Sequence, residues 1–154
     1  MTMQAPRSVA QVVSLTLGSA LLAVGVLALI FGSTDFGTGS ALGGETFIIW
    51  LANGWDAVIW IAFGAVGLLM AGRVDTARAY AFVAGAFFAV AAVWGFIDGD
   101  DVFGLMAVDT TDNISHAVIG ALALLTATLP APAQQPDRRR EPPGAYGHGH
   151  PSGI

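Results

Sequence analysis

The stretch VAQVVSLTLGSALLAVGVLALIF, residues 9–31, contains no charged side chain. At about 1.5 Å rise per residue, a helix of this length crosses the roughly 30 Å hydrocarbon layer of a bilayer. The stretch is longer than the apolar core of a signal peptide, and Arg7 is the only basic residue ahead of it. We therefore predict that residues 9–31 form an uncleaved first membrane span.

The composition of the whole chain agrees with this environment. Of its 154 residues, 55% are hydrophobic and 11% are charged, whereas a soluble domain carries about 25% charged residues. A chain this short cannot bury so much apolar surface in a core of its own. The net charge of −5 argues against a nucleic-acid partner, and the absence of cysteine excludes disulfides and thiolate metal sites.

Three later segments repeat the apolar character of the first. Residues 55–71 are uncharged apart from Asp56, residues 79–97 are uncharged, and residues 114–129 end before a proline, where a helix cannot easily continue. With the first span they form a membrane domain over residues 9–129. We predict an all-α integral membrane protein, folded as an antiparallel four-helix transmembrane bundle.

The charged residues predict how such a bundle is oriented. The six basic residues, all arginines, precede the first span, lie in the second loop or follow the last span: Arg7, Arg73, Arg78, Arg138, Arg139 and Arg140. The first and third loops contain acidic residues and no basic ones: Asp35, Glu45, Asp98, Asp100, Asp101 and Asp109. The positive-inside rule then places both termini in the cytoplasm and the protein in the cytoplasmic membrane.

The two ends of the chain differ from the membrane domain. Residues 1–8 are predicted to be a short cytoplasmic N-terminus. Residues 130–154 are rich in proline, arginine and glycine and poor in apolar groups, which predicts a disordered cytoplasmic tail. The tail contains His148 and His150, a weak metal-binding pattern in such a segment.

The second and fourth spans resemble each other when the chain is shifted by 56 residues. Residues 53–71 (NGWDAVIWIAFGAVGLLMA) then align with residues 109–127 (DTTDNISHAVIGALALLTA), and the identities include the pairs Asp56/Asp112 and Gly64/Gly120. We infer two repeated helical hairpins in the same orientation. Because small residues let helices approach closely in lipid, we expect spans two and four to meet through their glycines.

A polar cluster stands at the outer start of these two spans, at Asp56, Asp109, Asp112 and His116. Each span begins with Asn or Asp followed three residues later by Asp, which is typical of a capping box for unpaired backbone amides. This is the interpretation we favour. The alternative is a weak cation or proton site, because acids brought close together repel one another unless a cation or proton joins them.

His116 lies about 10 Å along the helix from Asp109. An ionisable group at that depth is a candidate for function. We favour the simpler interpretation, a neutral imidazole that donates a hydrogen bond to Asp112, four residues earlier on the same face. Trp60, its equivalent in the second span, is expected to lie at the membrane interface.

Three segments resemble one protein family: GAVGLL at residues 64–69, ARAY at residues 77–80 and VDTTDNISHAVIG at residues 108–120. The family is the bacterial, mostly actinobacterial one described as domain of unknown function 4383. The resemblance covers about residues 9–129 and implies four membrane spans. Its most specific element is the pattern Asp-Asn-x-x-His-x-x-x-Gly, met by Asp112, Asn113, His116 and Gly120.

The chain departs from the family in the second span. The family tends to carry histidines where this chain has Asp56 and Trp60, and asparagine where it has Asp109. Any ligand binding that the family's polar cluster performs is therefore in doubt for this chain.

The functions that remain differ in class. We expect a non-enzymatic membrane protein with an accessory, interaction or envelope role, because no span carries a row of polar groups at mid-membrane. The alternative is ion, proton or metal handling by the outer cluster, and the third is a membrane enzyme or redox subunit. No cofactor is expected. The expected partners are the lipid bilayer and a membrane protein or a second copy of the chain.

Overall fold

The computed structural model describes residues 6–130. The tail predicted to be disordered, with His148 and His150, lies outside the described residues except for Pro130. The helices of the described residues are α1 (Val9–Phe31), α2 (Gly54–Met70), α3 (Val74–Asp98) and α4 (Thr110–Thr128). The remaining elements are a short 3₁₀ turn, η1 (Gly39–Ala41), and the strands β1 (Glu45–Phe47), β2 (Trp50–Ala52), β3 (Asp101–Val102) and β4 (Met106–Ala107).

Each helix corresponds to one of the four predicted apolar runs. Two of the helices begin several residues before their run. Helix α1 has the bounds expected from residues 9–31, and α2 lies one residue earlier than residues 55–71. Helix α3 starts at Val74, ahead of the predicted position 79, because hydropathy does not register its polar first turn. Helix α4 starts at Thr110, ahead of the apolar run from residue 114 and directly after the cap predicted at Asp109.

Two of the four helices, α1 and α3, are long and apolar enough to cross a membrane. Helix α2 is apolar but has 17 residues. The structure of residues 6–130 is thus mostly helical, as predicted.

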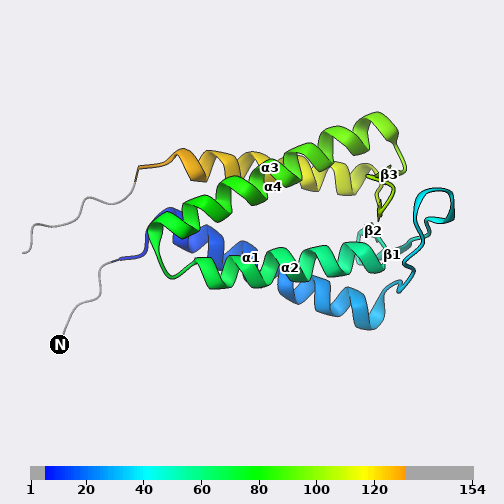
Figure 1. Cartoon of the computed structure of the whole chain (residues 1–154), viewed down its shortest axis with the longest axis horizontal. Coiled ribbons are helices and arrows are strands. Elements are labelled where there is room, and N and C mark those ends of the chain that lie inside the picture. The colour runs from blue at the N-terminus through cyan, green and yellow to red at the C-terminus, as the bar shows by residue number, and fades with distance from the viewer. Residues whose placement is uncertain (1–5, 131–154) are drawn as a thin grey trace, which may run out of the picture.

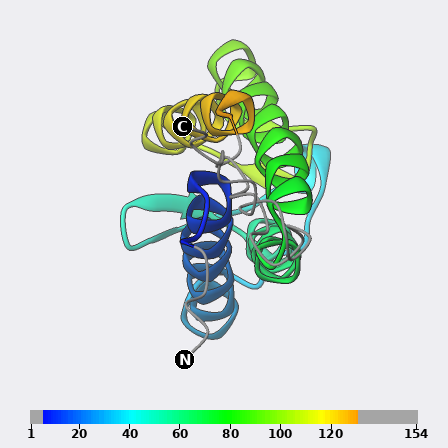
Figure 2. The ribbon, with the colours of Figure 1, turned by 90° about the vertical axis from the view of Figure 1, so that its left-hand side faces the viewer.

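The helices are arranged as two antiparallel pairs. Helix α1 packs along α2, and α3 packs along α4, with fewer contacts between the pairs. Figure 2 shows the pairs end-on as two layers. The start of α1, the α2–α3 turn and the end of α4 lie at one end of the molecule, and the strands lie at the other end (Figure 1). A buried core that includes Leu21, Trp60, Tyr80 and Phe88 lies between the layers.

The expected contact between spans two and four is wrong. Helices α2 and α4 do not pack along each other. A side chain at Gly64 would collide with Leu22 of α1, and a Cβ at Gly120 would lie 2.7 Å from the backbone nitrogen of Ala89 in α3. The glycines therefore serve contacts within each pair. The reason lies partly in α1, where Gly18 supplies the matching small residue against α2.

Two short antiparallel β-hairpins lie ahead of helices α2 and α4. Strands β1 and β2 pair ahead of α2, and β3 and β4 pair ahead of α4. The tip of the first hairpin holds Ile48 and Ile49, which are 64% and 56% exposed. Ile48 has a φ of 60°, an unfavourable value for a β-branched residue.

Candidate functional site

Helix α2 begins with two side chains that hold each other's backbone. Asn53 is the N-cap, and its Oδ1 accepts hydrogen bonds from the amides of Trp55 at 2.9 Å and Asp56 at 3.1 Å. The Asp56 carboxylate accepts in return from the Asn53 amide at 2.9 Å. Both Asn53 and Asp56 are buried. This confirms the predicted capping box at the start of the second apolar helix.

Helix α4 begins in the same way. Asp109 Oδ1 accepts from the Asp112 amide at 2.9 Å, and Asp112 Oδ2 accepts from the Asp109 amide at 3.1 Å. The second predicted capping box is thus also confirmed. A cap of this kind stabilises a helix by about 0.5–2 kcal/mol.

Each capping acid also faces the strand that precedes the other helix. The Leu51 amide of β2 donates to Asp112 Oδ2 at 3.0 Å, which joins the first hairpin to α4. The backbone amide of Ala107 in β4 lies near the Asp56 carboxylate, so the second hairpin lies beside the start of α2. Leu51 and Ala107 are 56 residues apart in the sequence, as are Asp56 and Asp112.

A further hydrogen bond links the two hairpin ends, and it has no equivalent in the other repeat among the described residues. Asn53 Nδ2 donates to the Leu105 carbonyl at 2.8 Å, while Asn53 Oδ1 caps α2. We use the name "bracket" for the residues that make these crossed contacts: Leu51, Asn53, Asp56, Leu105, Ala107 and Asp112. Sequence reasoning identified the capping residues of the bracket but not the amides and carbonyl that they reach.

His116 is buried below the bracket. Its ring lies against Phe88 of α3, with ring centroids 5.4 Å apart and an angle of 34° between the planes. Its Nδ1 is buried and has no hydrogen-bond partner among residues 6–130. The expected bond to Asp112 is not formed in this part of the chain, because the Asp112 carboxylate accepts from backbone amides instead.

The tryptophans beside His116 belong to the protein core. Trp60 was expected at the membrane interface but is buried, and its ring packs edge-on against Trp50 with centroids 6.4 Å apart. The Trp50 indole N–H donates to Ser115 Oγ at 3.0 Å, which is another bond between β2 and α4. The first hairpin therefore covers this part of the core.

Asn113 is a site residue to which the sequence reasoning assigned no role of its own. It is buried against Gly95 of α3, where any Cβ would collide with the Asn113 side chain. Its Oδ1 has no hydrogen-bond partner in the described part of the chain. The spacing of Asn113 and His116 by three residues is the signal, since it places both on the face of α4 that packs on α3.

The four candidate residues gather at one end of the molecule. Asp56, Asp112 and His116 are buried, and Asp109 is half-buried. Asp112 lies close enough to Asp56 for their charges to interact. Within residues 6–130, no group of three or more His, Cys, Asp or Glu side chains is arranged to hold a metal ion.

A crevice lies beside this cluster, between α1 and α4. Its volume is about 130 Å³. The residues that line it are apolar or aromatic apart from three on α4: Asp112, Ser115 and His116. It is therefore an apolar chamber with one polar end.

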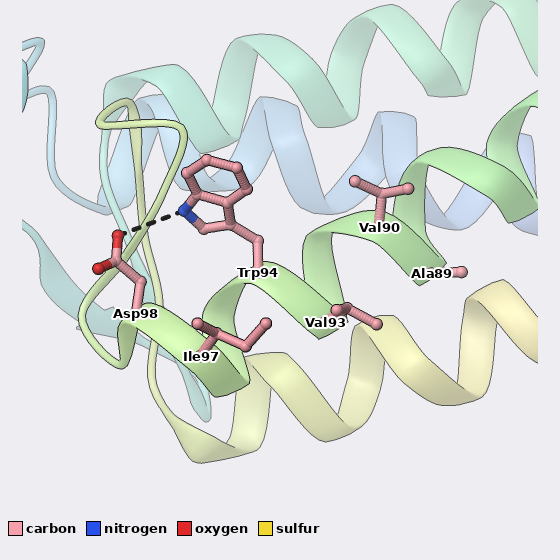
Figure 3. Close-up of a pocket in the computed structure, with 6 residues that line it drawn as sticks. All are labelled: Ala89, Val90, Val93, Trp94, Ile97 and Asp98. Atoms are coloured by element: carbon pink, nitrogen blue, oxygen red, sulfur yellow. Dashed lines mark hydrogen bonds between the residues drawn. The ribbon is translucent and has the colours of Figure 1, made fainter.

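A larger hollow of about 470 Å³ lies on the outer face of α3 (Figure 3). All of its lining residues belong to α3, and Ile97 among them is 82% exposed. The Asp98 carboxylate accepts a hydrogen bond from the Trp94 indole N–H at 3.3 Å, as Figure 3 shows, and the other lining side chains are apolar. This surface offers no polar group near the cluster, so we place the candidate site at the crevice and bracket.

Fold and site define a mostly helical protein with two helices apolar enough to cross a membrane and a buried polar cluster at one end. The family described as Domain of unknown function (DUF4383) matches residues 11–129, and the chain belongs to this family. The resemblance noted in the motifs is thereby confirmed. No curated protein and no solved structure matches the chain.

Proposed function

We propose that the protein is an integral membrane protein in which all four helices span the bilayer as two repeated hairpins. The observation that carries this proposal is the apolar surface on every helix. On α4, Val118, Leu122 and Leu125 form an exposed stripe, and on α2 Leu69 is 83% exposed. Contiguous exposed apolar surface of this extent is rare in soluble monomers.

The two longest helices support the same placement. Only 28% of the most apolar part of α1 and 44% of that of α3 are buried inside the protein. The core helix of a soluble protein buries most of its apolar residues. The exposed tip of the first hairpin, at Ile48 and Ile49, suits insertion into the interfacial region beside the helices.

The charges support an orientation with both termini in the cytoplasm. Arg7, Arg73 and Arg78 belong to the end that holds the α2–α3 turn, whereas Asp100 and Asp101 belong to the end that holds the hairpins (Figure 1). The positive-inside rule assigns the arginine end to the cytoplasm.

Single cysteines test this orientation, because the natural chain has none. Asp100 and Asp75 are both exposed and lie at opposite ends. In intact cells, Asp100→Cys should react with a membrane-impermeant maleimide, and Asp75→Cys should react only after the cells are opened. Labelling of Asp75→Cys alone in intact cells would reverse the orientation, and labelling of both would exclude the four-span arrangement.

For the biochemical role we propose a non-enzymatic accessory or interaction function, with a membrane protein or a second copy as partner. The supporting observation is that the carboxylates of Asp56 and Asp112 accept hydrogen bonds from backbone amides and so hold the fold together. Purification in mild detergent, followed by mass spectrometry of what co-purifies, tests the role. A stoichiometric protein supports it, whereas a stoichiometric metal or redox cofactor would favour the other classes.

Cation or proton handling is the second candidate. The observation that favours it is the closeness of two buried acids, Asp56 and Asp112. If the cluster binds a cation, added Mg²⁺ or Ca²⁺ should raise the melting temperature of the purified protein, and Asp112→Asn should abolish the rise. If it takes up a proton, the melting temperature should shift between about pH 5 and 8. If neither added cations nor pH changes the melting temperature, helix capping is the role that remains for the cluster.

A further inference from the structure

The crevice between α1 and α4 combines an apolar chamber with an unpaired imidazole. His116 is 4% exposed and lines the crevice, and its Nδ1 has no hydrogen-bond partner among residues 6–130. A buried polar nitrogen that has lost its bonds to water and gained none is costly. A ligand that bonded to the imidazole would recover this loss.

The two polar neighbours of His116 in the crevice each accept a hydrogen bond from the fold. Ser115 Oγ accepts from the Trp50 indole, and Asp112 Oδ2 accepts from two backbone amides. Among these three polar residues of the crevice, His116 is the one with a buried nitrogen that has no partner among residues 6–130, so we take the imidazole as the group that a ligand would bond. A ligand hydroxyl suits it in either tautomer, because a hydroxyl both donates and accepts.

The size and walls of the crevice fit one aromatic ring. Its volume of about 130 Å³ is close to that of an engineered apolar cavity of about 150 Å³ that binds benzene. Trp50, Trp60 and Phe88 supply aromatic walls, and Leu21 and Ile119 supply aliphatic ones. Aromatic walls favour a ring ligand through edge-on and offset contacts.

The rim of the crevice on α1 is partly exposed. Ala20, which lines it, is exposed, and Leu17 and Val24 on either side are half-buried. In the membrane placement proposed above, on which this step rests, these positions of the first span face lipid. A ligand would enter from the bilayer, and an apolar tail attached to its ring would stay there.

We propose that this crevice binds the hydroxylated aromatic ring of a lipid-soluble molecule, with the ring hydroxyl bonded to His116 and the tail in the bilayer.

Two small probes that differ by one hydroxyl test the proposal. Of the four tryptophans, Trp50 and Trp60 line the crevice. In the double variant Trp55→Phe/Trp94→Phe, Trp50 and Trp60 are the only remaining tryptophans, so the tryptophan fluorescence comes from the crevice. A bromine atom bound beside them quenches this fluorescence. The full chain in mild detergent should show saturable quenching by 4-bromophenol, with a Kd about tenfold below that for bromobenzene, the difference expected for one hydrogen bond.

Variants separate the imidazole from the chamber. His116→Phe should raise the Kd for 4-bromophenol about tenfold and leave that for bromobenzene unchanged, while His116→Gln should keep most of the preference. Ala20→Phe, at the rim, should weaken both probes. Val118 lies on the same helix as His116 and is 53% exposed. Val118→Ala is therefore the matched control and should leave the Kd of both probes unchanged.

Equal affinity for the two probes, or wild-type binding of 4-bromophenol by His116→Phe, would overturn the proposal and leave a groove for lipid or detergent chains. Absence of saturable quenching would also overturn it. If His116→Phe does not fold, the Kd values of the two probes for the natural chain and for Ala20→Phe still test the proposal. These titrations do not depend on topology, so their failure leaves the membrane placement standing, and failed topology with intact binding would remove only the lipid route of entry.

Discussion

At the scale of single residues, one oxygen of Asp112 carries two of the bonds that close the polar end of the molecule. Asp112 Oδ2 accepts from the Leu51 amide at 3.0 Å and from the Asp109 amide at 3.1 Å. The side chain is buried, so water cannot replace either bond. Asp112 thus caps α4 and holds β2 with the same atom.

We therefore predict that Asp112→Asn is mild and Asp112→Leu is severe. Asparagine keeps one carbonyl oxygen that can accept both bonds, whereas leucine leaves two partly buried amides without this acceptor, at up to about 1–3 kcal/mol each. Denaturant unfolding in detergent measures the loss in the free energy of unfolding. The exposed Asp100→Leu is the control and should stay within about 0.5 kcal/mol. Equal losses in the two Asp112 variants would assign the effect to charge instead of to the accepting oxygen.

At the scale of the elements, glycines set the distance between the helices of each pair. A Cβ at Gly25 of α1 would lie 2.8 Å from the backbone oxygen of Ala57 in α2, and a Cβ at Gly85 of α3 would lie 2.7 Å from the backbone nitrogen of Leu124 in α4. In lipid, where no hydrophobic force draws helices together, close packing of this kind is a main source of association.

We predict that Gly64→Leu weakens the contact of α1 with α2 and that Gly120→Leu weakens the contact of α3 with α4. Overpacking of this kind costs about 1–3 kcal/mol. Gly72→Leu is the matched control, because a Cβ at Gly72 would meet no atom within 4 Å. Thermal melting in detergent measures all three. A loss in the Gly72 variant as large as in the others would show that the effect is not one of helix contact.

Side chains also close the opposite ends of the helices. Gln11 of α1 donates to the Ala71 carbonyl at the end of α2, at 3.2 Å. Arg78 of α3 donates to the Ala127 carbonyl near the end of α4, from Nε at 3.2 Å and from Nη2 at 3.0 Å. Arg78 was counted among the arginines that orient the bundle, and the structure adds this capping role. A cation at a helix C-terminus is favourable because the helix dipole is negative there.

At the scale of the whole molecule, the bracket joins the two helical pairs at their hairpin ends. Asn53 and Asp109 occupy equivalent positions, but only Asn53 has a donor that crosses to the other hairpin, at the Leu105 carbonyl. Asp109 has a single capping bond, to the Asp112 amide. The equivalent residues therefore differ in what they hold together.

This difference predicts that Asn53→Asp is harmful and Asp109→Asn is not. Aspartate at position 53 keeps the cap but places a carboxylate oxygen against the Leu105 carbonyl, where a partly buried bond is lost at about 1–3 kcal/mol. Asparagine at position 109 keeps an oxygen that accepts from the Asp112 amide and should stay within about 0.5 kcal/mol of the natural chain. Unfolding in detergent compares the two variants. A harmless Asn53→Asp would mean that the pairs are joined by other contacts.

The sequence by itself determined the extent of α1, the capped starts of α2 and α4, and the family. These features depend on local interactions: an apolar run shows in composition, and a capping box joins residues three apart. The polar first turn of α3 was missed as helix because hydropathy does not register it.

Only the tertiary structure decided which helices pack together and what the buried polar groups bond. The 56-residue shift made α2 and α4 equivalent, and equivalence was mistaken for contact. Instead α1 packs on α2 and α3 packs on α4. Close approach of two helices needs small residues on both faces, such as Gly18 against Gly64. Likewise His116 was expected to bond Asp112, but the Leu51 amide, 61 residues away in the chain, bonds that carboxylate. Hydrogen bonds over such distances depend on the packing of whole elements, which no local pattern records.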